Sequence, residues 1–423
     1  MKSETGRRVD EAALLRTRRA GRTRAVGAFV GALGVVSVGF APSATAYDAQ
    51  SQEWYLKSMQ AEQMWKVSTG KGVKIAVIDT GVNPNTPSLK GQVLTDETPE
   101  AVAYHATDDY QGHGTSMAEL IAGTGVGGGV KGLAPGAKIV PYRIRLEGVK
   151  KSEEAKTPEP ADAIRAAADS DAKIINMSFD SPYVDPEEEA AIKYAASKGK
   201  LLIAGTGNTD SGKSRMGYPV SYPYVVGVAA VNKSLSVSKF STSGGYVDLA
   251  APGESIPGWC DATLRSYCDR KGTSASSAIA SAAAALIWSA HPDWTVNQVT
   301  RALIDTAGRT WAKDNPSKYA GYGFVRPRIV LANPHYDPGP ANEDPLADAN
   351  GGNLLANSAN TPTPSAPASS QASDSTSGGA TSAAGSSEDS GGSTSLWVAI
   401  GAALAVIVAG GAGFAVVRAR RAG

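Results

Sequence analysis

The sequence lacks an excess of charge of either sign, because its 41 lysines and arginines are balanced by 40 aspartates and glutamates. A chain with a net charge of +1 has no electrostatic reason to bind nucleic acid, so no nucleic-acid partner is expected. Aromatic residues are scarce, at 7%, whereas glycine and alanine are abundant. This composition favours an α/β core of closely packed helices and strands with disordered flanks.

Cysteine is nearly absent, and the two that occur are Cys260 and Cys268. So few soft ligands argue against a metal site, and we expect no cofactor. In an exported protein, two cysteines this close in sequence predict one disulfide, with two free thiols as the alternative. A loop this short would stabilise the fold by about 2.5 kcal/mol in the chain-entropy model.

The N-terminus has the pattern of an export signal. Seven arginines lie between Arg7 and Arg24, an apolar run extends from Ala25 to Ala41, and Ala44-Thr45-Ala46 follows. A basic region, a short apolar run and small residues for cleavage predict a signal peptide over residues 1–46. An uncleaved N-terminal anchor is the alternative, but the run is short for a membrane span.

A second membrane signal lies near the C-terminus, where Leu396–Val417 forms 22 residues without a charge. At about 1.5 Å per residue this run extends roughly 33 Å, enough to cross a bilayer core as one helix. Arg418, Arg420 and Arg421 follow directly. Positive residues stay inside, so residues 418–423 would form a cytoplasmic tail, with the preceding domain outside the cell membrane.

Two regions of different composition lie between these signals. Residues 47–336 are expected to form one globular domain. Residues 337–395 are rich in Ser, Ala, Gly and Pro and almost free of large apolar residues. Such a segment cannot bury enough surface to fold, so it predicts a disordered linker between domain and membrane.

Within the domain, buried-strand patterns alternate with helical patterns. Strands are predicted at 73–78, 138–145, 173–177 and 201–204. Helices are predicted at 113–122, 161–169, 186–197, 274–289 and 296–306, the last with Thr295 as its N-cap. This alternation predicts an α/β fold with a doubly wound, mostly parallel sheet and helices on both faces.

Three polar residues stand where predicted strands end or helices begin. Asp79 follows an apolar strand, His113 lies between two glycines, and Ser274 opens an alanine-rich helix. Taken singly, the aspartate could belong to a turn, the histidine to the core and the serine to a helix cap. A helix N-terminus also stabilises developing negative charge, which suits a nucleophile.

The chain order Asp, His, Ser is the order found in subtilisin. Seven short motifs accompany these residues: Ala-Val-Ile-Asp-Thr-Gly-Val at 76–82, Gly-His-Gly-Thr at 112–115, Gly-Leu-Ala-Pro-Gly-Ala at 132–137, Ile-Asn-Met-Ser at 175–178, Ala-Gly-Thr-Gly-Asn at 204–208, Val-Asp-Leu-Ala-Ala-Pro-Gly at 247–253 and Gly-Thr-Ser at 272–274. From about Gly70 to Pro334 the chain therefore resembles the subtilisin-like (subtilase) serine peptidases.

The resemblance implies a role for each site residue. Ser274 would be the nucleophile, His113 the general base and then acid, and Asp79 the group that orients the imidazole. Asn208 would donate to the oxyanion beside the Ser274 backbone N–H, a contribution of roughly 3 kcal/mol. A plain turn residue is the alternative for Asn208, and Asn176 is a rival that resembles the family's structural asparagine.

Two stretches depart from the family pattern. The residues after Ser274 are Ala275-Ser276-Ser277-Ala278, with alanine where the family has proline. The strand that would pair with substrate is Ser178-Phe179-Asp180, with a carboxylate in place of glycine. Asp180 would then favour Lys, Arg or small polar substrate residues, unless it faces solvent or caps the next turn.

The arrangement of the whole chain resembles one branch of the family, the membrane-anchored mycosins linked to type VII secretion. Only about 32 residues separate the predicted cleavage site from Asp79, too few for the family's usual prodomain. This resemblance implies protein or peptide substrates and proteins of a secretion complex as partners. Calcium is common in subtilases, but no acidic loop here has convincing ligand spacing.

Two other function classes compete with an active peptidase. A scaffold or peptide-binding protein with the same fold would be expected to lack a catalytic or oxyanion residue, and none is missing. An esterase would usually have Gly-x-Ser-x-Gly and the order Ser, Asp, His, and neither is present.

Overall fold

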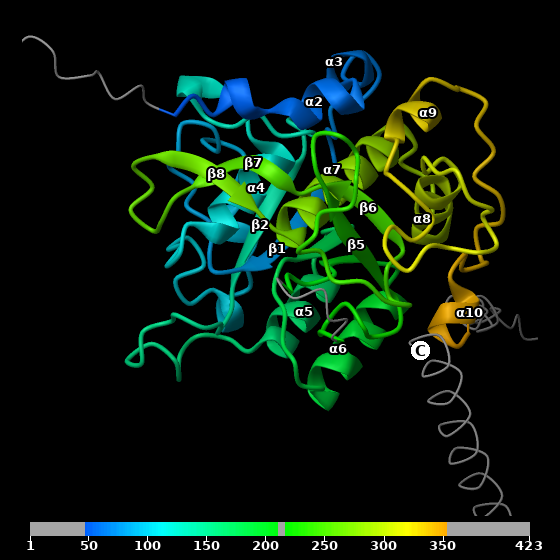
Figure 1. Ribbon diagram of the computed structural model, residues 1–423. Coiled ribbons are helices and arrows are strands. Elements are labelled where there is room, and N and C mark those ends of the chain that lie inside the picture. The colour runs from blue at the N-terminus through cyan, green and yellow to red at the C-terminus, as the bar shows by residue number, and fades with distance from the viewer. Residues whose placement is uncertain (1–46, 210–215, 353–423) are drawn as a thin grey trace, which may run out of the picture. The chain divides into compact units, whose positions relative to one another are not determined.

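The computed structural model describes residues 47–209 and 216–352 (Figure 1). The chain divides after Tyr47 into two compact units, and every described residue except Tyr47 belongs to the second, Asp48–Gly423. The predicted signal peptide (residues 1–46), membrane span (residues 396–417) and cytoplasmic tail (residues 418–423) lie outside the described residues and stay predictions.

A six-stranded sheet forms the centre of this unit, in the order β2-β1-β3-β4-β5-β6, with every neighbouring pair parallel. The predicted fold class is confirmed, and each predicted strand is present within two residues of its expected ends, whereas β5 and β6 were not predicted. The strands are β1 (Lys74–Asp79), β2 (Lys138–Arg143), β3 (Ile174–Met177), β4 (Leu201–Gly205), β5 (Val225–Val231) and β6 (Leu249–Pro252).

Helices cover both faces of the sheet (Figure 1). The helices are α4 (His113–Ala122), α5 (Pro160–Asp169), α6 (Pro186–Ser197), α7 (Thr273–Ala290) and α8 (Val296–Asp305). Because side chains alternate along a strand, Ala76 and Ile78 of β1 join the core beneath α5 and α6. The other face packs against α4 and α7.

Helix α7 is the core helix of the domain, and half of its side chains are fully buried alanines and serines. Small side chains let its backbone lie close to strands β3 to β6. Among the described helices, α7 alone is long and apolar enough to cross a membrane, but 83% of that stretch is buried within the protein. Its burial is that of a core helix.

Helix α8 begins as expected, with Thr295 as its N-cap. Thr295 Oγ1 accepts from the Gln298 backbone N–H, and Gln298 Oε1 accepts from the Thr295 N–H at 3.0 Å. This reciprocal pair satisfies two backbone donors that a helix start leaves unpaired.

A two-stranded antiparallel hairpin, β7 (Glu254–Trp259) and β8 (Tyr267–Lys271), connects β6 to α7. The shorter elements are α2 (Trp54–Met59), α3 (Ala61–Met64), α9 (Pro327–Leu331), α10 (Ala347–Asn350) and the 3-10 turns Gln50–Gln52, Thr95–Glu97, Glu100–Val102 and Val126–Gly128.

The linker boundary predicted at Asp337 differs from the structure, in which residues 337–352 are ordered against the domain. Thr295 and Asn297 both donate to the Ala341 carbonyl, at 2.9 and 3.1 Å. Leu346 is only 4% exposed, and Asn350 Oδ1 accepts from the Tyr224 backbone N–H. Polar side chains of α8 therefore hold a segment whose own composition predicts disorder.

Candidate active site

The predicted site residues collect at the carboxyl edge of the sheet. Asp79 is the last residue of β1, and Ser178 follows β3 directly. Strand β1 is also where the topology reverses, since β2 lies on one side of it and β3 on the other. In open parallel sheets the crevice at such a reversal is the usual ligand site. Residues far apart in sequence therefore meet there.

Asp79 and His113 form a hydrogen-bonded pair, with Nδ1 and Oδ1 separated by 2.7 Å. Asp79 is fully buried, and its Oδ1 also accepts from the Thr80 backbone N–H at 2.7 Å. The His113 side chain is 26% exposed, so its ring joins a buried carboxylate to an open cleft. An ionised Asp79 fixes the tautomer that has its proton on Nδ1, which leaves Nε2 as the acceptor.

The electrostatic surroundings of His113 raise its pKa above the ordinary value. Burial lowers this pKa, but the charge and hydrogen bond of Asp79, together with the charge of Asp109, raise it by more. The positive charge of Arg270 acts in the opposite direction and lowers it. The two carboxylates thus stabilise the imidazolium form, whereas burial and Arg270 oppose it.

The glycines on either side of His113 are required by close packing. Gly112 has φ +77°, and a Cβ there would lie 2.5 Å from the Asp261 carbonyl oxygen. A Cβ on Gly114 would collide with the Gly81 carbonyl and lie 3.0 Å from the Asp79 Cβ. Any side chain at either position would push His113 away from Asp79.

Ser274 is the second residue of α7 and is partly exposed in the cleft. Its Oγ donates to the Ser178 carbonyl oxygen at 3.3 Å. Ser274, His113 and Asn208 all line one cavity of about 170 Å³. The hydroxyl, the imidazole and the amide thus share one small volume at the start of an 18-residue helix.

Asn208 is oriented by the residue before Ser274. Its Oδ1 accepts from the Thr273 backbone N–H at 2.9 Å and from Thr273 Oγ1 at 3.3 Å. The amide Nδ2 then points away from Thr273, and a Cβ on Gly272 would lie 3.6 Å from it and 3.8 Å from the Ser274 nitrogen. The Asn208 amide and the Ser274 backbone N–H therefore flank the same small space, where they could both donate to an oxyanion.

The rival asparagine is structural. Asn176 is fully buried in β3, where its Nδ2 donates to Ser178 Oγ at 2.8 Å and its Oδ1 accepts from Ser281 Oγ at 3.1 Å. The Oδ1 bond joins β3 to α7, the Nδ2 bond holds the residue just after β3, and Asn176 does not line the cavity.

Comparison with known proteins identifies the family. The family model described as "Subtilase family" matches residues 70–323, which is more than half of the chain. This chain belongs to the subtilase family.

Named relatives agree with this assignment. The family match and these relatives together identify the protein as a serine endopeptidase. The major intracellular serine protease of Bacillus subtilis is 32% identical over 283 residues, covering 64% of this chain and 86% of that protein. Thermitase of Thermoactinomyces vulgaris is 31% identical over 285 residues, covering 64% of this chain and 95% of thermitase.

Solved structures point to the mycosin branch. The MycP3 protease from the type VII (ESX-3) secretion system is 30% identical, with a TM-score of 0.55, and the match covers 68% of this chain and 90% of that one. MycP1 from Mycobacterium smegmatis is 25% identical, with a TM-score of 0.56, and the match covers 71% and 88% of the two chains.

The strand end expected to contact substrate is only partly at the cleft of this subtilase. Ser178 meets Ser274, as described, but the Phe179 side chain is buried in the core beneath α5 and α6. Asp180 is exposed, and its carboxylate lies against Gly217, outside the cavity. The pleat turns the Phe179 side chain toward the opposite face, so Phe179 could pair with substrate only through its backbone, and that pairing stays a prediction.

Asp109 is a site residue that sequence reasoning missed. Its Oδ1 accepts from Thr80 Oγ1 at 2.7 Å and from the Gly112 N–H at 2.8 Å, while its Oδ2 accepts from the Thr115 N–H at 2.8 Å. One nearly buried carboxylate thus binds both the strand end beside Asp79 and the start of α4. Its place just before a helix that starts without another cap was the available signal.

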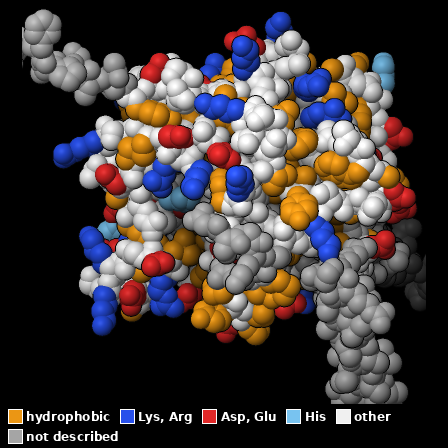
Figure 2. Space-filling model, in the orientation of Figure 1, with side chains coloured by type: hydrophobic (Ala, Val, Ile, Leu, Met, Phe, Trp, Pro, Cys, Tyr) orange, Lys and Arg blue, Asp and Glu red, His pale blue; other side chains and the backbone are white. Residues whose placement is uncertain are grey.

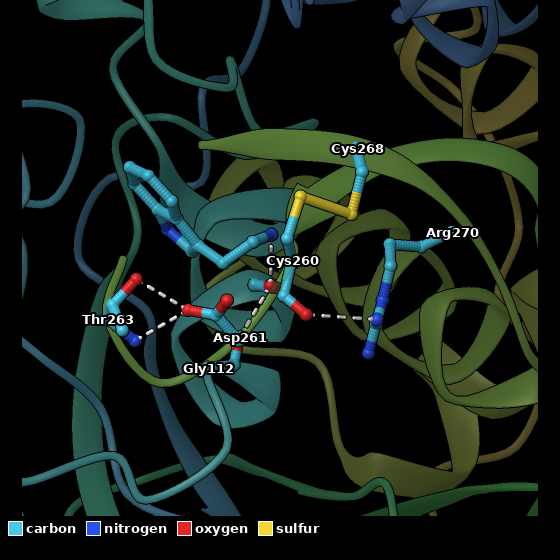
Figure 3. Close-up of a disulfide and its surroundings, with 8 residues drawn as sticks. Gly112, Cys260, Asp261, Thr263, Cys268 and Arg270 are labelled. Atoms are coloured by element: carbon cyan, nitrogen blue, oxygen red, sulfur yellow. Dashed lines mark hydrogen bonds between the residues drawn. A yellow bond between two sulfur atoms is a disulfide. The ribbon is translucent and has the colours of Figure 1, made fainter. Parts of the chain in front are cut away.

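The β7–β8 hairpin also packs against the start of α4. Cys260 and Cys268 form a disulfide with a Cα–Cα distance of 5.4 Å, as the sequence predicts (Figure 3). The Trp259 backbone N–H donates to Ser116 Oγ on α4 at 2.9 Å. The Asp261 carbonyl within the disulfide-linked loop packs against Gly112, so this loop lies against the residue just before His113. Among the described residues, no group of three or more His, Cys, Asp or Glu side chains could hold a metal ion.

Proposed function

We propose that this subtilase hydrolyses peptide bonds through a triad of Ser274, His113 and Asp79. The observation that carries the proposal is the 2.7 Å bond from His113 Nδ1 to a buried Asp79, in a cavity that Ser274 and Asn208 share. Burial removes Asp79 from solvent, so its charge acts on the imidazole with little screening.

In the first half of the reaction, Ser274 Oγ bonds to the scissile carbonyl carbon while its proton passes to His113 Nε2. The hydroxyl, which donates to Ser178 in the free enzyme, turns to His113 when substrate binds. The resulting oxyanion accepts from Asn208 Nδ2 and the Ser274 N–H. The C–N bond then breaks, and His113 protonates the leaving amine.

The second half repeats this chemistry with water. His113 takes a proton from a water molecule that attacks the acyl carbon, and the proton returns to Ser274 Oγ as the acyl group leaves. Asp79 keeps the imidazole in place and stabilises its charged form in both halves. The raised pKa of His113 is in the direction this role requires.

A fluorophosphonate probe on the full-length protein tests the nucleophile. Wild type should be labelled, and Ser274→Ala should not. Ser289→Ala is the matched control, because Ser289 lies on the same helix and its hydroxyl bonds to the Lys71 carbonyl, away from the cavity. Equal labelling of wild type and Ser274→Ala would show that another residue is the nucleophile. A folded wild type that stays unlabelled would favour the scaffold function instead.

We further propose that the protein is held at the outer surface of the cell membrane by residues 396–417 and processes exported proteins of a type VII-like secretion system. The uncharged 22-residue run and the similarity to MycP1 and MycP3 support this. Secreted proteins from cells with wild-type protein or Ser274→Ala would be compared by mass spectrometry. Loss of cleaved forms in the variant is expected, and identical secreted proteins would contradict the role.

A further inference from the structure

Strand β8 brings two basic residues into the cleft directly before the proposed nucleophile. Arg270 and Lys271 are the last residues of the strand, and both line the cavity that contains His113 and Ser274. Both are exposed. Figure 2 shows lysine and arginine side chains gathered around a histidine on this face. The cavity wall is therefore positively charged on this side, although the Lys271 ammonium lies over the Phe240 ring, 5.5 Å from its centroid.

Arg270 is held in place without an ion-pair partner among the described residues. Its Nη1 donates to the Cys260 carbonyl oxygen at 3.4 Å, next to the disulfide (Figure 3). The side-chain stem lies between the hairpin and α4, since a Cβ on Gly258 would lie 3.0 Å from Arg270 Cγ and 3.2 Å from Ser116 Oγ. One carbonyl contact leaves most of the five guanidinium N–H groups available for another acceptor.

Arg270 lies on the side of the cavity where the segment after the scissile bond would bind. Ser116 lies one turn beyond His113 on α4, so Arg270 packs on the His113 side of the cavity. Ser178, at the end of β3, contacts Ser274 from the other side. Because His113 protonates the leaving amine, the leaving segment of the substrate must lie next to the imidazole, and so next to Arg270.

The charge of Arg270 also disfavours the charged form of His113, as its effect on the histidine pKa indicates. An anionic group bound to Arg270 would offset this effect at the moment when the imidazolium forms. A substrate with a carboxylate in its leaving segment would thus gain both an ion pair and a better general acid.

We propose that Arg270, assisted by Lys271, binds an Asp or Glu side chain at the first or second position after the scissile bond. The proposal rests on the triad function above and adds the substrate class to it. The alternative is that Arg270 serves only to fix the hairpin through the Cys260 carbonyl.

The test uses internally quenched peptides that differ only at these two positions, which carry Glu, Gln or Lys. For wild type we expect kcat/KM for Glu to exceed that for Gln by about three- to fivefold, the effect of a partly exposed ion pair. Lys should be the poorest. The preference should shrink in 1 M salt, where screening is strong.

Substitutions then distinguish binding of an acidic side chain from a purely structural role of Arg270. Arg270→Gln should reduce the Glu preference and the double variant with Lys271→Gln should abolish it, whereas Arg270→Lys should retain part of it. Arg265→Gln is the matched control, since Arg265 lies on the same hairpin but outside the cavity. Fluorophosphonate labelling of each variant checks that the site is intact.

Two outcomes would overturn the inference: equal rates for Glu and Gln peptides in wild type, or an unchanged preference in the double variant. Either would leave the triad function standing, because peptides would still be cleaved. If wild type cleaves no peptide of any composition, the proposed function itself fails and the inference fails with it.

Discussion

Glu119, on the helix that carries His113, allows the effect of burial on a carboxyl group next to the active site to be tested. It lies on α4, fully buried, where Oε1 accepts from Thr86 Oγ1 at 2.8 Å and Oε2 accepts from the Tyr267 hydroxyl at 2.9 Å. It therefore ties the helix that carries His113 to strand β8. No basic side chain forms an ion pair with it among the described residues.

Burial raises the pKa of Glu119 from 4.5 to about 7, although the hydrogen bonds from Thr86 and Tyr267 act to lower it. Between these two pH values the folded state keeps a proton that the unfolded state has lost. Stability must therefore fall as pH rises from 4.5 to 7 and level off above that. A difference of this size corresponds to about 3 kcal/mol.

Glu119→Gln removes the ionisation and keeps the size of the side chain. At pH 5 the variant and its parent should be about equally stable, because both side chains are neutral. At pH 8 the variant should be more stable by about 3 kcal/mol, because it no longer buries a charge.

Urea unfolding at pH 5 to 8 measures this effect, with Ser274→Ala in every protein to prevent self-digestion. Glu62→Gln, at an exposed position of α3, is the matched control and should change the pH dependence little. If the gain from Glu119→Gln is the same at pH 5 and pH 8, Glu119 does not hold a proton in the fold and the reasoning is refuted.

Three further predictions concern the site and the chain around it. Asn208→Ala should lower kcat by about 10² to 10³-fold with little change in KM, and an unchanged kcat would point to another oxyanion donor. Asp180→Gly should leave a peptide-library profile unchanged, because the Asp180 carboxylate is exposed and lies outside the cavity, and altered preferences would show that Asp180 takes part in selection. Protease added to intact cells should release the catalytic domain by cutting between residues 353 and 395, and protection of the whole domain would contradict the proposed topology.

The residues of the proposed triad are easier to find in the sequence than the side chains that hold them in place. Asp79, His113 and Ser274 could be found because motif order and strand ends locate them without knowledge of packing. The orientation of Asn208 depends on the Thr273 N–H and hydroxyl, and the role of Asp109 on the Thr80 hydroxyl. Such side-chain contacts arise only when the loops are brought together.

Three features that the sequence did not reveal share a physical cause. Strand β8 is polar, and its pairing is fixed by the disulfide and by the register of Trp259 with Tyr267. Residues 337–352 are ordered by polar side chains at the start of α8 together with the single buried leucine, Leu346. The Phe179 side chain packs in the core on the face away from the cleft, which the sequence around Ser178 does not reveal. In each case a tertiary contact decides what local composition does not.

The most direct test of the central claim is the turnover of a peptide amide by the full-length protein in detergent. The account predicts that wild type and Ser289→Ala hydrolyse it at the same rate, and that Ser274→Ala lowers kcat by several orders of magnitude, to about 10⁻⁶ of wild type where the triad acts as a unit. Wild-type turnover by Ser274→Ala would contradict the assignment of Ser274 as the nucleophile.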